Sequence, residues 1–153
     1  MRALIQRVSQ ASVSVEGHVV AAIEHGLVVL VGVARDDTEA DARYLAEKTA
    51  NLRILPDDSG KFNLSTLDMS GEVLVVSQFT LMASTRKGRR PSFSEAASPE
   101  KAEPLVDTFA QFLRSAGLKV ETGRFQQHML VEIHNDGPIT ILLDSEERLK
   151  PRH

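Results

Sequence analysis

Four consecutive residues at the end of an apolar run combine two hydroxyl groups with a side-chain amide: Ser77, Gln78, Phe79 and Thr80. Such groups can hold a carbonyl or a ribose. A Ser or Thr nucleophile also needs a base nearby. The sequence has no Gly-x-Ser-x-Gly elbow, and no spacing ties a histidine to Ser77 or Thr80. His128 is the nearest candidate, but a lone histidine is more often a satisfied core or surface residue, so a serine-hydrolase triad is poorly supported.

A run of cations follows directly after this polar stretch. It places four basic residues within five positions of a chain whose formal net charge is −3: Arg86, Lys87, Arg89 and Arg90. Arg forks and Lys point charges bind phosphate oxygens, and Phe93 could stack on a base. A solvated charge run is the plainer alternative. Because the run adjoins the polar stretch, we favour an RNA or nucleotide ligand that arrives there.

The third stretch of interest is Asn135-Asp136-Gly137-Pro138, which lies between two short apolar runs, 129–133 and 139–143. Each run is rich in β-branched residues and typical of a strand. Gly allows positive φ, whereas Pro fixes its own φ and donates no hydrogen bond. The sequence therefore predicts a turn between two buried strands. It is either a plain turn or a rigid corner that aims backbone carbonyls at a fixed point.

Other site chemistries find little support in the sequence. The chain has no cysteine, which excludes a disulfide, a thiol nucleophile and a cysteine-ligated metal. Its five histidines, His153 among them, show no metal-ligand spacing. The segment 57–60 lacks the further ligands of a calcium loop, and Lys87-Gly88 lacks the framework of a phosphate loop. We expect neither a metal nor a cofactor.

Length and composition indicate the class of protein in which these stretches occur. With 153 residues, 42% apolar and 25% charged, the chain has the profile of one soluble globular domain over residues 1–153. No apolar run approaches the ~20 residues of a membrane span, and residues 1–8 lack the layout of a signal peptide. We therefore expect a cytoplasmic protein with no membrane partner. Because the overall charge is acidic, a nucleic acid would have to meet a local basic patch.

Hydrophobic periodicity predicts the elements. The first helix should be capped by Asp37 or Thr38, with Asp41 at a capping-box position if Thr38 is the cap. The second should begin after Ser98, with Pro99 as its first residue. A continuous apolar run at 27–33 should form a central strand covered on both faces. Strands are expected at 2–8, 11–15, 19–23, 27–33, 72–76, 118–121, 129–133 and 139–143, and a flexible tail at 145–153.

Two of these stretches together make the chain recognisable. Residues 77–81, Ser-Gln-Phe-Thr-Leu, and residues 135–140, Asn-Asp-Gly-Pro-Ile-Thr, closely resemble the motif pair of the D-aminoacyl-tRNA deacylases. The resemblance runs almost end to end and includes the opening 1–8, the basic loop 85–93 and the segment 121–125. Either motif alone would be weak, but the pair at this separation is highly specific.

The resemblance implies a homodimeric α/β fold, α+β-like in character. In a single domain, antiparallel-rich sheets would form a barrel-like core with two main flanking helices. It also implies hydrolysis of the ester between a D-amino acid and tRNA, and of glycine mischarged to alanine tRNA. Residues 77–80 would line the pocket. Gly137 and Pro138, joined by a cis bond, would form a chiral gate that reaches into the partner's pocket. The tRNA contacts are expected from Arg86, Lys87, Arg89 and Arg90, and no DNA partner is expected.

The mechanism and two rival functions stay open at this stage. Thr80 is the obvious protein nucleophile but lacks an evident base, whereas the tRNA offers a ribose hydroxyl next to the ester. We favour the RNA-assisted route, in which that hydroxyl and a water are positioned and backbone amides near Phe79 stabilise the oxyanion. The rivals are a non-catalytic RNA-binding module, which leaves the corner unexplained, and a small-molecule D-amino-acid esterase or peptidase, which leaves the basic loop unexplained.

Overall fold

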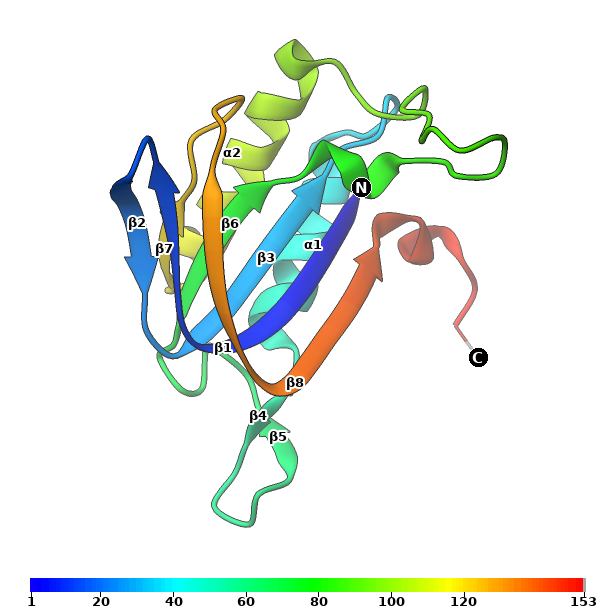
Figure 1. The fold of residues 1–153 in the computed structure, drawn as a ribbon. Coiled ribbons are helices and arrows are strands. Elements are labelled where there is room, and N and C mark those ends of the chain that lie inside the picture. Colours follow the sequence, from blue (N-terminus) through cyan, green and yellow to red (C-terminus); the bar gives the residue numbers. More distant parts are fainter. Residues whose placement is uncertain (153) are drawn as a thin grey trace.

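Two long strands dominate the architecture. The computed structural model describes residues 1–152, in which β1 (Arg2–Val15) and β8 (Leu130–Asp144) pair antiparallel from Arg2↔Asp144 to Ser14↔Leu130. Both strands bend, and β8 turns at one end of the molecule (Figure 1). The register shifts between Gln6 and Gln10, where the bend lies. The whole sheet is arranged around this pair.

The other strands extend the sheet from β1. The first half of β1 pairs with β3 (Gly26–Gly32), which runs parallel to β6 (Glu72–Ser77), and β6 runs parallel to β7 (Lys119–Thr122). The second half of β1 pairs instead with β2 (His18–Ile23). The sheet therefore coils into the expected barrel-like shape, nearly closed (Figure 1). A small hairpin, β4 (Leu55–Pro56) and β5 (Phe62–Leu64), projects beside the bend of β8.

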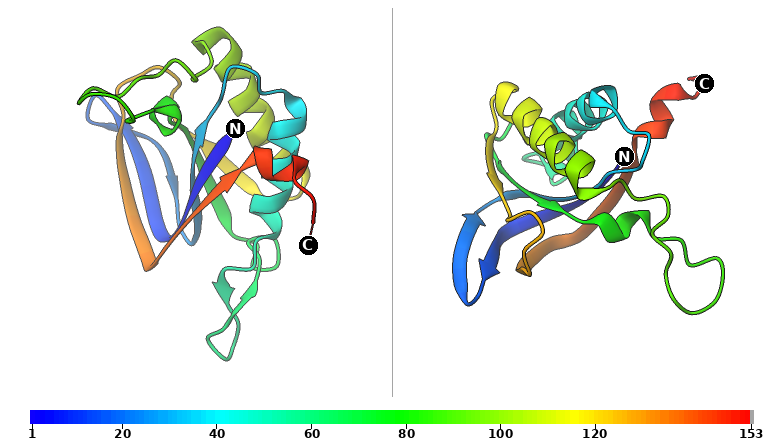
Figure 2. Two further views of the ribbon diagram at one scale, coloured as in Figure 1. Left: turned by 90° about the vertical axis from the view of Figure 1, so that its right-hand side faces the viewer. Right: turned by 90° about the horizontal axis from the view of Figure 1, so that it is seen from above.

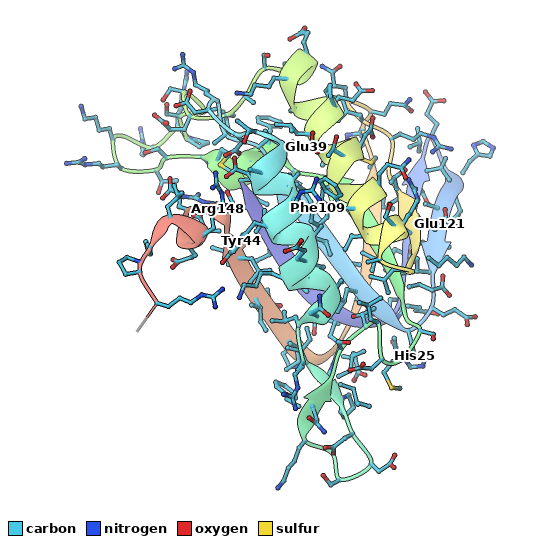
Figure 3. The ribbon with its side chains drawn as sticks, turned by 180° about the vertical axis from the view of Figure 1, so that it is seen from behind. His25, Glu39, Tyr44, Phe109, Glu121 and Arg148 are labelled. Atoms are coloured by element: carbon cyan, nitrogen blue, oxygen red, sulfur yellow. The ribbon has the colours of Figure 1, made fainter. Side chains whose placement is uncertain are left out.

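Two helices cover one face of the sheet, as Figure 2 shows. They are α1 (Glu39–Asn51) and α2 (Pro99–Ser115). Of the two predicted caps of α1, Thr38 is the N-cap, and its N–H donates to Asp41 Oδ2 at 2.8 Å. The predicted start of α2 is confirmed, with Pro99 after the N-cap Ser98. Phe109, fully buried, lies between the helices and the sheet (Figure 3).

The sheet separates two apolar clusters. One lies under the helices and includes Ile5, Leu45 and Phe109; the other fills the inside of the coiled sheet and includes Val13 and Leu74. The central strand β3 contributes to both, since Leu27, Val28 and Val29 are all 0% exposed. The prediction that this run is covered on both faces is confirmed. Burial on both sides makes β3 and β6 the rigid base from which the polar residues after β6 project.

Two boundary predictions are wrong for the same reason. The expected strands 2–8 and 11–15 are one strand, β1, and the expected strands 129–133 and 139–143 are one strand, β8. The segment around Gly137-Pro138 is thus not a turn that pairs the runs with each other. Both runs instead pair with β1, before and after the register shift. Local turn chemistry predicted the change of direction, but the pairing partner is distant in sequence.

The expected flexible tail is also wrong for residues 145–149, which form the 3-10 helix η2 (Ser145–Leu149). Ser145 is fully buried, and its Oγ accepts a hydrogen bond of 2.9 Å from the Met1 ammonium group. Arg148 Nε lies 3.5 Å from Asp41 Oδ1, beside α1 (Figure 3). These contacts fasten the end of β8 to the start of β1 and to α1. His153 lies outside the described residues.

The environment of Asp41 predicts a pH-dependent contribution to stability. Burial pushes its pKa up. Hydrogen bonds from Thr38 and Ser145 and the positive charges of the N-terminus and Arg148 together outweigh burial, so the pKa lies below its ordinary value of 3.8. Asp41→Asn should lower the free energy of unfolding at pH 7 by about 1–3 kcal/mol, because it removes charge-assisted hydrogen bonds. Urea unfolding at a series of pH values measures the effect.

The direction of this pH dependence follows from the thermodynamic linkage between proton binding and folding. A carboxyl group with a lowered folded-state pKa stabilises the protein above its ordinary pKa, and the contribution is lost as the pH falls through the folded-state value. The difference between wild type and Asp41→Asn should therefore shrink below about pH 4. Asp58→Asn, at an exposed loop position, is the matched control. An equal difference at pH 7 and pH 3 would contradict the assignment.

Candidate functional site

A cleft of ≈ 740 Å³ opens where β6 ends. Ser77 is the last residue of β6, and the chain then enters the 3-10 helix η1 (Phe79–Met82), with Gln78 as its N-cap. Gln78 N–H donates to Val31 O at 2.8 Å, which anchors the start of η1 to β3. Ser77, Gln78 and Phe79 line the cleft. The polar stretch identified in the sequence therefore forms one wall of a cavity large enough for a small-molecule group.

Thr80 lies slightly apart from this wall. Its side chain is exposed and is not among the residues that line the cleft. Gln78 Nε2 donates to Thr80 Oγ1, so the amide fixes the hydroxyl. His128 lines the cleft, yet within residues 1–152 no hydrogen bond joins a histidine to Ser77 or Thr80. The arrangement is not that of a base-activated hydroxyl nucleophile.

A second wall of the cleft comes from a segment in which the sequence analysis had considered His128, as a candidate base, and had assigned no other residue to the pocket. Between β7 and β8 the chain runs through an irregular loop, and the cleft is lined there by Phe125, Gln126, Gln127, His128 and Met129. Gln126 has φ +62°, and Gln127 N–H donates to Arg124 O at 3.2 Å, which closes a turn. Gly123 was the available signal, because glycine after a strand often marks an irregular backbone.

Two aromatic rings line the cleft, and the basic loop lies between them in the sequence. The rings of Phe79 and Phe93 pack edge to face with their centroids 5.0 Å apart, and both line the cleft. The basic loop precedes Phe93, and Ser84 and Ser92 exchange two backbone hydrogen bonds of 2.8 Å at its base. Its side chains are exposed, including Arg86, Lys87, Arg89 and Arg90. The loop follows η1 in the chain, and Figure 1 shows it extending away from the body of the protein.

The start of α2 forms a further part of the cleft wall, which the sequence analysis also missed. Ala97, Pro99 and Ala102 all line it. Ala97 N–H donates to Val33 O at 2.9 Å, so the segment before α2 is fixed to the chain just after β3. Small side chains at these positions leave the space open, and no local pattern distinguishes them from an ordinary helix start.

The segment Asn135–Thr140, which we call the corner, is held by side chains on both sides. Asn135 bridges it: its Oδ1 accepts from Ile139 N–H at 2.7 Å, and its Nδ2 donates to Ile139 O at 3.1 Å. Arg7 Nε donates to Asp136 O at 2.8 Å, and Arg7 Nη1 donates to Ile54 O at 2.8 Å. The Gly137–Pro138 peptide bond is cis, and both residues are exposed. The corner is a fixed, protruding piece of backbone.

The corner and the cleft do not meet within one chain. Ser77 pairs with Val31, which pairs with Ala3, whereas the corner lies beside Arg7, four residues further along β1. With about 3.3 Å per residue and 4.8 Å between each of the three strand pairs, the separation is on the order of 20 Å. Figure 1 agrees, since η1 and the bend of β8 lie at opposite ends of the molecule.

A second hollow of ≈ 570 Å³ differs in chemistry. Its lining is mostly charged and polar and includes Glu24, Glu72, Lys119, Glu132 and His134. Lys119 Nζ lies 3.5 Å from Glu72 Oε2. It has no aromatic wall and no nearby basic loop, so the cleft at the end of β6 is the better candidate site.

Two further findings concern the described part of the chain, residues 1–152. No three His, Cys, Asp or Glu side chains come together there in a way that could hold a metal ion. No helix in that range combines the length and the apolar character needed to cross a membrane.

Comparisons with known proteins show which family this chain is similar to. The sequence profile of the family described as "D-Tyr-tRNA(Tyr) deacylase" matches residues 4–144. A protein of Roseiflexus sp. (strain RS-1), described as "D-aminoacyl-tRNA deacylase", is 62% identical to this chain over 153 residues, and the match covers 100% of this chain and 99% of the relative. One from Thermotoga petrophila is 58% identical over 147 residues, covering 96% and 99%.

Two solved structures share the fold. One, described as "c-Myc DNA Unwinding Element Binding Protein", has a TM-score of 0.89 and 40% identity, and the match covers 94% of this chain and 98% of the other. The second, a "probable eukaryotic D-amino acid tRNA deacylase", has a TM-score of 0.82 at 17% identity with the same coverage, and supports the fold alone. Fold and cleft thus define a single-domain α/β protein with a barrel-like sheet and a cavity at the end of β6. The family profile and the named relatives are those of a hydrolase family. The chain belongs to the D-Tyr-tRNA(Tyr) deacylase family.

The two hydrogen bonds between Asn135 and Ile139 predict that replacing Asn135 loosens the corner. Asn135→Ala removes both hydrogen bonds to Ile139, and each such bond contributes about 0.5–1.5 kcal/mol net. The Ile139 amide should exchange its hydrogen faster, and the free energy of unfolding should fall by about 1–3 kcal/mol. Hydrogen exchange read by mass spectrometry measures the first effect. Asn51→Ala is the control, since its Nδ2 donates to Glu47 O on the exposed side of α1. Equal exchange at Ile139 in both variants would contradict the role of Asn135.

Proposed function

We propose that the chain hydrolyses the ester that joins a D-amino acid to the 3′ end of tRNA, as a chiral proofreading step in the cytoplasm. Water adds to the ester carbonyl carbon, the bond from that carbon to the ribose oxygen breaks, and the ribose oxygen takes a proton. The observation that carries the proposal is the cleft after β6, with amide and hydroxyl groups on its wall, two aromatic rings in its lining and a basic loop between these rings in the sequence.

Each part of the cleft corresponds to a part of this substrate. The Phe79–Phe93 pair offers an aromatic surface on which the terminal adenine can stack. The exposed cations of the basic loop suit the phosphates that precede it. Ser77 and Gln78 are placed to bind the ribose and the aminoacyl carbonyl.

The corner supports a chiral gate that works between two subunits. In one protomer it lies about 20 Å from the cleft, so it can act only on the cleft of a second copy. The outer face of the β1–β8 pair offers a surface for that copy, because Leu142 is 55% exposed and Leu4 lies opposite it in the register. A homodimer related by a two-fold axis would bring each corner to the partner's cleft.

A gate made of backbone explains the expected substrate range. Fixed main-chain atoms exclude an L side chain by contact, without distinguishing one D side chain from another. Glycine has no side chain to exclude, so glycine mischarged to alanine tRNA is included in the proposal. Asn135 and Arg7 support the required rigidity, since they hold the main chain on either side of Gly137.

For the chemical step we propose assistance by the RNA. Thr80 is exposed and hydrogen-bonded by Gln78, and no basic group of the described chain activates it. The ribose hydroxyl next to the ester is part of the substrate, and holding it with a water supplies rate through proximity. The first N–H groups of a helix have no acceptor within the helix. Those at the start of η1 are therefore suitable donors to an oxyanion. The reaction needs no cofactor.

The first test of this function compares substrates. D-tyrosyl-tRNA should be deacylated and L-tyrosyl-tRNA left intact. A substrate that ends in 2′-deoxyadenosine should react very slowly, and Thr80→Ala should keep measurable activity. An RNA-binding module would bind both aminoacyl-tRNAs and cleave neither, and a small-molecule esterase would cleave a D-tyrosine methyl ester as well as the tRNA. Capture of an acyl group on Thr80 would contradict the RNA-assisted route.

A second test addresses the gate. A Cβ at residue 137 would lie 2.7 Å from Ile139 Cγ1 and 3.3 Å from Arg7 Nη2, and φ is +146°. Gly137→Ala must therefore displace the corner, and rejection of L-tyrosyl-tRNA should weaken. Gly17→Ala is the matched control, because φ is +79° there with open space around it. Light scattering tests the subunit arrangement. A monomer at micromolar concentration with full D selectivity would contradict a gate that acts between subunits.

A third test addresses the basic loop. If its cations bind phosphates, tRNA affinity should fall steeply with salt, and each lost phosphate contact should reduce the slope by about 0.7–0.9. Arg86→Ala with Arg90→Ala should flatten the slope while the thermal unfolding temperature stays nearly unchanged, because both side chains are exposed. Lys48→Ala with Lys61→Ala removes two exposed cations elsewhere as a control. Single-stranded DNA as competitor shows whether the surface prefers RNA.

A further inference from the structure

Met129 contacts both ends of the loop that forms the second wall of the cleft. Its Sδ accepts a hydrogen bond of 3.3 Å from the Arg124 backbone N–H. The same sulfur lies close against Gly123, since a Cβ placed there would be 2.8 Å from it. The rest of the side chain packs on the apolar cluster inside the coiled sheet, and Met129 also lines the cleft. One thioether therefore joins the start of the loop to its end.

Other restraints on this loop are few. Gly123 N–H donates to Val75 O at 3.0 Å, where the loop leaves β7, and Gln127 N–H donates to Arg124 O at 3.2 Å within the turn. Gln126, Gln127 and His128, which face the cleft, are exposed. Phe125 packs against the apolar cluster under the helices. The position of residues 126–129 relative to Ser77 and Gln78 thus depends on these few contacts, among which the sulfur contact joins the two ends of the loop.

We propose that Met129 is an oxidation site through which peroxide controls the shape of the cleft. The inference rests on the proposed function, because it assumes that this cleft receives the aminoacyl end of the tRNA. A thioether lone pair attacks one peroxide oxygen, the O–O bond breaks, and the released hydroxide takes the proton of the hydroxyl group now on sulfur to become water. The sulfur is oxidised by two electrons to the sulfoxide and the peroxide is reduced, a reaction that methionine sulfoxide reductases reverse.

The surroundings of Met129 determine the consequence. A sulfoxide is polar, and its oxygen seeks hydrogen bonds that the apolar cluster around Leu74 and Val76 cannot provide. Gly123 leaves no space for an added oxygen on its side of the sulfur. The oxidised group must therefore turn towards the cleft, which withdraws the sulfur from the Arg124 N–H. The loop loses its restraint and the second wall moves.

The experiment compares oxidation at two methionines. Met69 is 52% exposed and lies outside the cleft, so it reports the strength of the treatment. Wild type and Met69→Leu, treated with hydrogen peroxide, should lose D-tyrosyl-tRNA deacylation in parallel with oxygen uptake at Met129, by roughly ten- to hundredfold for a displaced wall. Sulfoxide reductases A and B should restore it. Met129→Leu, compared with its own untreated activity, should resist the treatment.

Hydrogen exchange at the Arg124 amide provides a readout that does not depend on activity. It should be faster in oxidised wild type than in untreated protein, and unchanged by treatment in Met129→Leu. Met129 oxidised with unchanged activity and unchanged exchange would overturn the inference, as would a Met129 that stays reduced while Met69 is fully oxidised. If the untreated protein cleaves no D-aminoacyl-tRNA, the proposed function fails, and the exchange measurement still decides whether Met129 restrains the loop.

Discussion

The pairing of β1 with β8 is the constraint on which the rest of the structure depends. Alternate residues of β1 are buried over most of its length, those of β8 are half-buried, and the two strands keep their pairing through the register shift between Gln6 and Gln10. Because β1 changes its second partner from β3 to β2 at that point, the sheet coils and encloses a second apolar cluster. The corner occupies the outside of the bend, so its exposure is a direct result of how the sheet coils.

The same coiling fixes the cleft at the other end. The parallel strands β3 and β6 are buried on both faces and end together, with Val31 paired to Ser77. Backbone hydrogen bonds from Gln78 to Val31 and from Ala97 to Val33 then attach η1 and the start of α2 to this edge. Polar groups at the carboxyl end of parallel strands are thereby held by the most rigid part of the sheet, as positioning of a substrate requires.

Rigid and adjustable parts of the molecule are separated. The polar wall is attached to the ends of β3 and β6, and the side chains of Asn135 and Arg7 hold the corner. The second wall of the cleft is an irregular loop whose two ends are joined by the Met129 thioether. Loops of this kind open at lower free energy than core strands do. This distribution is what the proposed function requires: the corner and the polar groups stay fixed while the remaining wall responds to ligand or to oxidation.

Elements whose causes are local could be predicted from the sequence. These were the helix start at Asp37 or Thr38, the cap at Ser98, the buried run at 27–33, the polar residues from the end of β6 and the basic loop, because neighbours in the sequence produce them. Tertiary structure alone decided that two apolar runs form one strand on β1, that Ser145 binds the N-terminus, and that the loop at 123–129 completes the cleft. It also placed the corner and Ser77 at opposite ends. Such pairings join residues far apart in the chain, so the local sequence pattern cannot predict them.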